Sequence, residues 1–399
     1  MTFRPRRWRR AGLAGLLACC AAALTGCAEL GYYWQSASGH LAVMRAARPV
    51  PDWLADPAAP AALKARLELA QRIRRFAVTE LGLPDNASYT AYADLRRPAA
   101  VWNVVAAPPY SLVLQTWCFP VAGCVGYRGY YDDAAALAEA AVQRALGLEA
   151  AVYPVPAYST LGWTNWAGGD PLLSTFIGYP EGELARLIFH ELTHQMVYVP
   201  GDTRFNESFA TAVERIGGAR WLAAQASEAA REEYAQFDGR RRQFRALTLE
   251  TRGRLAQVFA SEAARAGDWP AVEILKAAAM AEFRERYARL RAGWPPSRQA
   301  AYDGWVARAN NAMFGAQAAY DDLVPAFEAL YERESRGGGD VWPRFYAQVR
   351  RIAELPPAGR EQALREAGER DATTESPSGA KASSPELHHP HHEKETPGA

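Results

Sequence analysis

The stretch His190-Glu191-Leu192-Thr193-His194 has the pattern H-E-x-x-H, and it decides how the rest of the chain is interpreted. Residues 182–189 before it have a helical composition, and residues four apart on a helix lie on one face. Both imidazoles can therefore bind one Zn2+ ion, with Glu191 placed to take a proton from water at the metal. The alternative is a buried amphipathic helix with two incidental histidines. The chain has only seven histidines, four of them in its tail, which favours the metal site.

A catalytic zinc site usually has three protein ligands and one open position, so a third ligand is expected. Glu207 and Glu214 are the candidates that follow the motif. The Pro-Gly pair at 200–201 predicts that the first helix ends near Val199, and a second helix can begin just beyond it. If the two helices are antiparallel, Glu207 returns level with His194, whereas Glu214 returns about 10 Å further along. This geometry favours Glu207 as the ligand and gives Glu214 a supporting role.

The segments around this motif resemble the zinc site of gluzincin peptidases. Aminopeptidase N relatives have similar H-E-L-x-H-Q and N-E-G-F-A segments, which correspond here to residues 190–195 and 206–210, with a shorter gap between them. The resemblance implies that Glu207, after Asn206, is the third ligand, and we expect Asn206 to support the site. The spacing from His194 to Glu214 is instead similar to that of thermolysin-type enzymes, so Glu214 stays open as the alternative ligand.

A larger part of the chain resembles a group of bacterial lipoproteins named as zinc aminopeptidases. The similar segments are residues 31–35, 118–130, the zinc segment and 310–312. This resemblance implies a zincin-like core and zinc-dependent hydrolysis of peptide bonds, with Glu191 as the general base. One feature of aminopeptidase N relatives is missing, namely the G-x-M-E-N segment that helps to bind a free amine. The nearest stretch, residues 162–167, has no acidic residue, and Asp170 is the closest carboxylate upstream of the motif.

Two other classes of function remain open. An endopeptidase or a peptidoglycan-directed amidase would use the same residues on a different substrate. A non-catalytic envelope lipoprotein could hold a structural zinc, although a structural site has no use for Glu191.

Two further features of a gluzincin site are expected from the resemblance. The developing oxyanion needs a hydrogen-bond donor, which gluzincins often supply as a tyrosine or histidine. The body contains one other histidine, His40, far away in sequence, so we expect a tyrosine, with Tyr320 as the candidate. Residues 158–161 or 172–175 could form the strand that pairs with substrate, although such apolar runs also suit a core.

The N-terminus has the pattern of a bacterial lipoprotein signal. Five arginines precede a short apolar run, which ends in Leu24-Thr25-Gly26-Cys27 and resembles a lipobox. Acylation of Cys27 would anchor the protein in a lipid bilayer. The residue after Cys27 is not an aspartate, so we expect the outer membrane, facing the periplasm. An ordinary secretory signal with a chance cysteine is the alternative.

Two cysteines remain after signal cleavage and lipidation, namely Cys118 and Cys124. In an oxidising compartment, two cysteines six positions apart with Pro and Gly between them can close a tight disulfide loop. Free thiols or soft metal ligands are the alternatives.

The remaining composition predicts an α+β fold with a mostly helical C-terminal half. We divide the chain into a signal peptide (1–26), a linker (27–57), a zinc metallopeptidase domain (58–366) and a disordered tail (367–399). Within the domain, strands are expected in 86–180, the zinc helices in 181–217 and further helices in 218–366. The net charge of +1 gives no indication of nucleic-acid binding. The expected elements are a helix at 60–83, strands and turns at 89–131, a helix at 132–146, a strand at 150–158, a loop at 162–171 and mostly helices from 206 to 353.

Overall fold

The computed structural model describes residues 30–120, 122–163, 165–318 and 322–372. It confirms a mixed α+β fold in which helices predominate. Residues 30–46 are helical, and two short 3-10 turns lie at Asn165–Ala167 and Pro296–Arg298. The α-helices are α2 Val50–Ala55, α3 Ala61–Leu81, α4 Asp133–Ala145, α5 Glu181–Thr193, α6 Thr203–Ala224, α7 Glu228–Phe259, α8 Glu262–Ala266, α9 Trp269–Ala292, α10 Ala300–Arg308, α11 Asn311–Ala318, α12 Val324–Ser335, α13 Val341–Ala353 and α14 Pro357–Ala372.

The described strands form three small sheets. In the first, β2 (Ala91–Ala93) pairs antiparallel with β1 (Ala47–Pro49) and parallel with β8 (Leu172–Leu173). In the second, β3 (Val101–Ala107) lies between β6 (Arg128–Tyr130) and β7 (Glu149–Val155), both antiparallel to it. The third is a hairpin of β4 (Trp117–Phe119) and β5 (Gly123–Val125). Strands and turns were predicted for this part of the chain.

The hairpin of β4 and β5 carries the predicted disulfide. Cys118 and Cys124 lie opposite each other in its register, and their sulfur atoms are bonded. Gly201 lies against the turn of this hairpin, and its N–H donates to the carbonyl of Ala122 at 2.9 Å. The hairpin therefore contacts the connection between α5 and α6.

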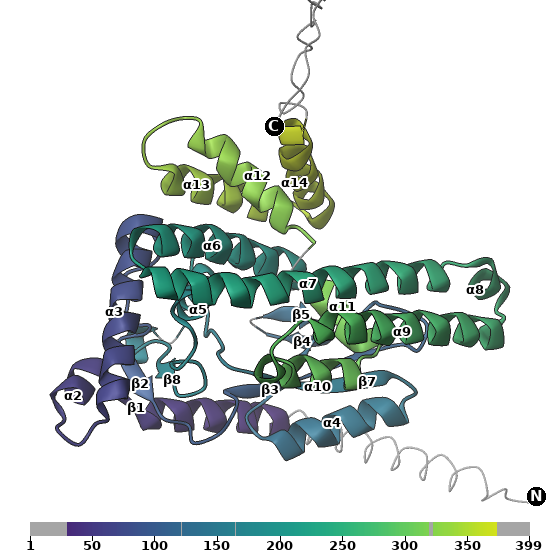
Figure 1. The fold of residues 1–399 in the computed structure, drawn as a ribbon, viewed down its shortest axis with the longest axis horizontal. Helices are drawn as coiled ribbons and strands as arrows, with labels where there is room; N and C mark the ends of the chain where they lie inside the picture. Colours follow the sequence, from purple (N-terminus) through teal and green to yellow (C-terminus); the bar gives the residue numbers. More distant parts are fainter. Residues whose placement is uncertain (1–29, 121, 164, 319–321, 373–399) are drawn as a thin grey trace, which may run out of the picture.

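The antiparallel pair of α5 and α6 packs within the main hydrophobic core, with α3 and α12 against it. Figure 1 shows α6 alongside the first part of the long helix α7, with α3 at their left end and α12, α13 and α14 beyond α6. Side chains from both α5 and α6 are fully buried in this core, including Phe189, Phe205 and Phe209. Burial of each such side chain stabilises the fold by roughly 1.5–3 kcal/mol. The core therefore fixes α5 and α6 relative to each other.

Two adjacent glycines allow α6 to approach its neighbours closely. A Cβ atom at Gly217 would lie 2.6 Å from Leu81 Cδ1 and 3.0 Å from Phe189 Cδ2. A Cβ at Gly218 would lie 2.7 Å from Cγ of Arg186 on α5. Larger residues at these positions would push the helices apart and shift every side chain between them.

The helices α7, α9, α10 and α11 form a lobe with a smaller aromatic core. A buried polar network joins this lobe to the second sheet. Lys276 on α9 contacts Glu149 on β7 and donates to the carbonyl of Pro109 at 2.8 Å. The backbone N–H of Asn311 donates to Glu149 at 2.7 Å, and its side chain binds the carbonyls of Pro108 and Pro109. The segment 310–312, which resembles the bacterial lipoprotein group, therefore connects the helical lobe to the second sheet.

Three predicted boundaries differ from the structure. The stretch 27–57 was predicted to be a linker, but its described part contains the helix 30–46, β1 and α2, and its residues Val43 and Val50 belong to the main core. The first zinc helix ends at Thr193 rather than near Val199. The chain after it is diverted because Gln195 binds Asn86 at 2.7 Å and Ser88 at 3.1 Å. The C-terminal helix α14 continues to Ala372, and Ala367 is buried, so ordered structure extends past the predicted boundary at 366.

The two ends of the chain lie outside the described residues, including the signal segment, Cys27 and the four histidines of the tail. Within the described ranges, no helix is both long enough and apolar enough to span a membrane.

Candidate metal centre

The two motif histidines and Glu207 converge on one point. His190 lies in the last turn of α5, and His194 caps the C-terminal end of that helix, so helical geometry brings their rings together, edge to face, with centroids 4.9 Å apart. The two Nε2 atoms are 3.2 Å apart. Glu207 Oε2 is 3.2 Å from His190 Nε2 and 3.6 Å from His194 Nε2. All three side chains are about nine-tenths buried.

The connection between α5 and α6 brings Glu207 to this point. Asp202 caps α6, and its carboxylate accepts a hydrogen bond from the N–H of Phe205 at 3.0 Å. Asn206 makes two hydrogen bonds of 2.8 Å with the backbone N–H and carbonyl of Val199. These bonds fix the turn, so that Glu207, the next residue, faces α5. Asn206 acts through the backbone rather than through a side chain of the cluster.

Glu214, two turns further along α6, orients His190 from the other side. Its carboxylate lies 2.8 Å from His190 Nδ1 and also contacts Arg186. A carboxylate only accepts hydrogen bonds, so Nδ1–H of His190 donates to Glu214, and Nε2 is the nitrogen that faces Glu207 and His194 and would bind a metal ion. Burial alone would raise the pKa of Glu214, but Arg186 and His190 outweigh it and lower this pKa to about 2.

The cluster has the donor set of a metal site. His190, His194 and Glu207 each offer one ligand atom, and these atoms lie within 4.8 Å of one another. His194 Nδ1 is buried and has no hydrogen-bond partner among the described residues, so no hydrogen bond at this nitrogen fixes the orientation of the ring. Two imidazole nitrogens and a carboxylate oxygen suit a divalent cation of borderline softness. The group could therefore hold a metal ion.

Glu191 lies next to this cluster without belonging to it. Its side chain lines the cavities on both sides of the histidines. Burial raises the pKa of Glu191, while the positive charge on His190 and His194 opposes that shift. A carboxylate whose pKa is moved towards neutrality can both take up and release a proton, which is the property of a general base.

One comparison with known proteins identifies the family. A family model described as "Putative aminopeptidase" matches residues 31–364, most of the chain. The chain belongs to this aminopeptidase-like family. The search of curated proteins and the search of solved structures gave no significant match.

In this member of the family, a cavity of about 380 Å³ opens on one side of the ligand cluster. His190, Glu191, His194 and Glu207 line it, together with an aromatic wall. The aromatic residues of that wall are Tyr32, Phe119, Tyr127, Tyr131, Tyr158 and Tyr198. We call this space the aromatic cavity. None of its described lining residues is a lysine or arginine.

Two tyrosines of the aromatic cavity lie close to the ligand cluster. Burial raises the pKa of Tyr127, and the nearby carboxylate of Glu207 raises it further. Burial and Glu207 raise the pKa of Tyr198 in the same way. Both hydroxyls therefore stay protonated, and that of Tyr198 donates to the carbonyl of Ala122 at 3.4 Å. Two weak signals for them are present in the sequence, since Tyr127 lies in the segment 118–130 and Tyr198 follows the motif by four residues.

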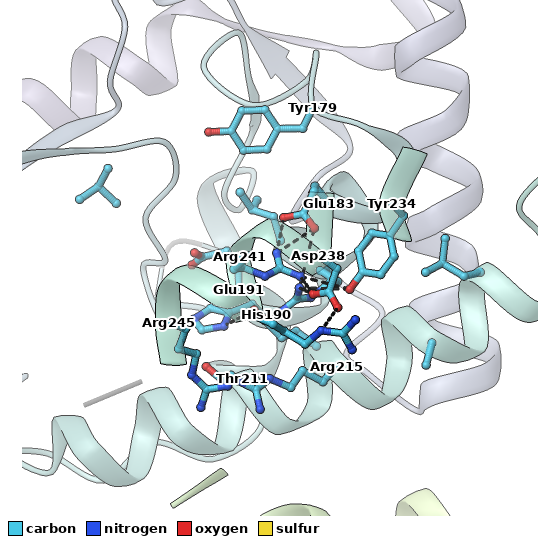
Figure 2. A pocket seen from close by; sticks show the side chains of 17 residues that line it. Tyr179, Glu183, His190, Glu191, Thr211, Arg215, Tyr234, Asp238, Arg241 and Arg245 are labelled. Atoms are coloured by element: carbon cyan, nitrogen blue, oxygen red, sulfur yellow. Dashed lines mark hydrogen bonds and ion pairs between the residues drawn. The ribbon is translucent and has the colours of Figure 1, made fainter. Parts of the chain in front are cut away.

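The opposite side of the cluster has a larger cavity of about 730 Å³, also lined by His190 and Glu191. Figure 2 shows His190 within its lining, with Glu183, Tyr234 and Asp238 on one side and Thr211 and Arg245 on the other. Arg186, Arg215, Arg241, Arg242 and Arg245 line this space, which we call the arginine cavity. Three carboxylates besides Glu191 also line it, namely Glu183, Glu214 and Asp238.

Three other sequence expectations can be placed. Tyr320 lies outside the described residues, so its role stays a prediction. Residues 158–161 contribute three side chains to the aromatic cavity, although β7 ends before them, at Val155. The alternative segment 172–175 begins with two core leucines of β8. Asp170 is buried and accepts the N–H of Thr160 at 3.1 Å, so it holds the loop 158–161 and does not line either cavity.

Proposed function

We propose that this protein is a zinc-dependent aminopeptidase with a zincin-like core formed around α5 and α6. The observation that carries the proposal is the convergence of His190, His194 and Glu207 beside Glu191, at a point that both cavities reach. A bound Zn2+ would lower the pKa of water and polarise the peptide carbonyl. The domain that does this would begin near residue 30, because Tyr32 lines the aromatic cavity and Val43 and Val50 belong to the main core, and it would continue to the end of α14.

The protein's own groups supply the remaining steps. Glu191 takes the proton from the attacking water and transfers it to the leaving amine. Tyr127 has a protonated hydroxyl at the aromatic cavity and is suited to donate to the developing oxyanion, whereas Tyr198 would first have to release its 3.4 Å hydrogen bond to Ala122. Glu214 keeps His190 in one tautomer and one orientation. The intact general base beside the cluster argues against a purely structural zinc.

Endopeptidase or amidase action is the second candidate, because one feature of the lining favours it. An aminopeptidase binds the free α-amine of its substrate, typically through a carboxylate. Among the described lining residues, Glu183 contacts Arg241 at 2.7 Å, Asp238 contacts the same arginine, and Glu214 contacts Arg186. These carboxylates already have cationic partners. Glu191 and Glu207 are then the acidic groups closest to an incoming amine.

Blocking the substrate amine distinguishes the two modes of action. A peptide with a free N-terminus should be hydrolysed, and its N-acetylated form should be hydrolysed at least 100-fold more slowly, since acetylation removes the charge that the site must bind. Product release from both peptides, followed by mass spectrometry, gives the answer and the cut position. Equal cleavage of the two peptides would assign the protein to the endopeptidases.

We also propose that Cys27 anchors the protein in the outer membrane, facing the periplasm. The disulfide between Cys118 and Cys124 is consistent with an oxidising compartment. Cys27→Ala should move most of the protein from the membrane fraction to the soluble fraction, because the acylated residue is lost. Cys20→Ala, within the signal segment, is the matched control and should fractionate like wild type. If Cys27→Ala also stays with the membranes, acylation at Cys27 is not the anchor.

A further inference from the structure

We propose that the arginine cavity binds a carboxylate of the substrate on the C-terminal side of the scissile bond. The preferred substrates would then be short acidic peptides. This inference rests on the proposed peptidase function. It depends on the position of the arginine cavity, on its charge and on the contrast with the aromatic cavity.

The arginine cavity reaches the reacting centre. His190 and Glu191 line both cavities, so a ligand that extends across the centre enters one cavity on each side. The arginine cavity has a volume of about 730 Å³, within the range of small-molecule sites. A substrate of several residues can therefore place one part there while its scissile bond lies beside Glu191.

The arginines that line the arginine cavity all lie on helices. Its five arginines come from α5, α6 and α7. The lining contains four carboxylates including that of Glu191, so the arginines outnumber them by one. Glu183 forms ion pairs with Arg186 and Arg241, and Glu214 forms one with Arg186. Arg242 is 3.3 Å from Asp238, and its side chain is 73% exposed, so it can reach a ligand at the mouth.

Arg215 and Arg245 add a second cationic pair to the lining. Burial lowers the pKa of Arg215, and the neighbouring charge of Arg245 lowers it further. Arg215 lies 3.6 Å from Glu328, which does not line the cavity. Both guanidinium groups line the cavity, so an anion bound there could interact with both. A carboxylate is the anion that a peptide offers.

The contrast between the cavities gives the direction of the peptide. The aromatic cavity has no described lysine or arginine in its lining, and Glu207 lies at its inner end. An N-terminal ammonium suits this side, where tyrosine rings and a carboxylate favour a cation. The arginines on the other side would repel it. The N-terminal residue would therefore occupy the aromatic cavity, and the leaving part, with its carboxylate, the arginine cavity.

Four tripeptides with a common N-terminal half test this assignment. They are Ala-Ala-Glu and Ala-Ala-Gln, each with a free or an amidated C-terminus, assayed with zinc-loaded protein. The fully acidic peptide should have a kcat/KM about 10- to 100-fold above that of the fully neutral one, mainly through KM, as expected for hydrogen bonds to a charged group. Loss on amidation alone identifies the terminal carboxylate, and loss on Glu-to-Gln exchange alone identifies the side chain.

Arginine variants locate the effect. Arg242→Gln and Arg245→Gln should each reduce the ratio of kcat/KM for the acidic peptide to that for the neutral peptide. Arg254→Gln is the matched control, because Arg254 lies on the same helix, α7, is 60% exposed and does not line the arginine cavity. Thermal unfolding shows whether each variant is folded. Arg242 is the more exposed of the two, so its variant serves if Arg245→Gln does not fold.

A binding measurement separates this inference from the peptidase proposal. Calorimetric titration of the four peptides into Glu191→Gln protein should show the same order of affinity without any turnover. If no peptide is hydrolysed by wild type but acidic peptides bind through Arg242 or Arg245, the peptidase proposal fails and the cavity assignment stands. Equal affinities for the acidic and neutral peptides, or a preference that survives in both arginine variants, would overturn the assignment.

Discussion

Glu191→Gln should lower kcat for peptide hydrolysis by about 10²- to 10⁴-fold, the usual contribution of a general base. Glutamine has nearly the same shape as glutamate but cannot accept the proton of the attacking water. The substitution leaves His190, His194 and Glu207 in place, so the metal content should not change. Steady-state kinetics and metal analysis on the same preparation measure the two quantities.

A matched glutamate checks that the effect belongs to the site. Glu232 is exposed on α7 and lines neither cavity, so Glu232→Gln should keep wild-type kinetics. Similar thermal unfolding of the two variants would show that both are folded. A Glu191→Gln protein that retains more than a tenth of wild-type kcat would remove Glu191 from the mechanism.

The local elements of this chain could be predicted because each depends on short-range signals. Asp132 caps α4 through the N–H of Ala135, and Asp202 caps α6 through the N–H of Phe205, as expected for aspartate at a helix start. The helix spacing of His190 and His194 is likewise local. The end of α5 was missed because it depends on Asn86 and Ser88, about a hundred residues upstream.

The position of Glu207 could be argued from the sequence, although the end of the first helix was wrong. Its place depends on where α6 begins and on the antiparallel direction, and both are set by the turn that Asn206 fixes. The structure accordingly places Glu207, not Glu214, within reach of both Nε2 atoms.

The lining of the cavities could not be predicted, because it comes from segments that are distant in sequence. Tyr127 reaches the centre from the loop before β6, and the arginines 241, 242 and 245 reach it from α7. The sequence shows these arginines among acidic residues of a long helix, which is typical of a solvated face. Packing of α7 across α5 turns part of that face towards the centre. No local pattern distinguishes it from the rest of the helix.

Glu207→Ala should abolish stoichiometric zinc binding, whereas Glu214→Gln should retain about one zinc per chain with an affinity roughly 10- to 100-fold lower. Glu207 lies beside both Nε2 atoms, and Glu214 lies on the Nδ1 side of His190, so Glu214 cannot take the place of the lost ligand. Glutamine is used at position 214 because alanine would remove the closest partner of the buried Arg186, at a cost of up to about 3–5 kcal/mol. Metal content after dialysis, together with competition against a chelator, measures both effects.

Loss of zinc in Glu214→Gln with retention in Glu207→Ala would assign the third ligand to Glu214, as the thermolysin-like spacing suggests. Retention in both variants would show that neither glutamate is required, and the site would then be held by the two histidines with ligands from outside this cluster.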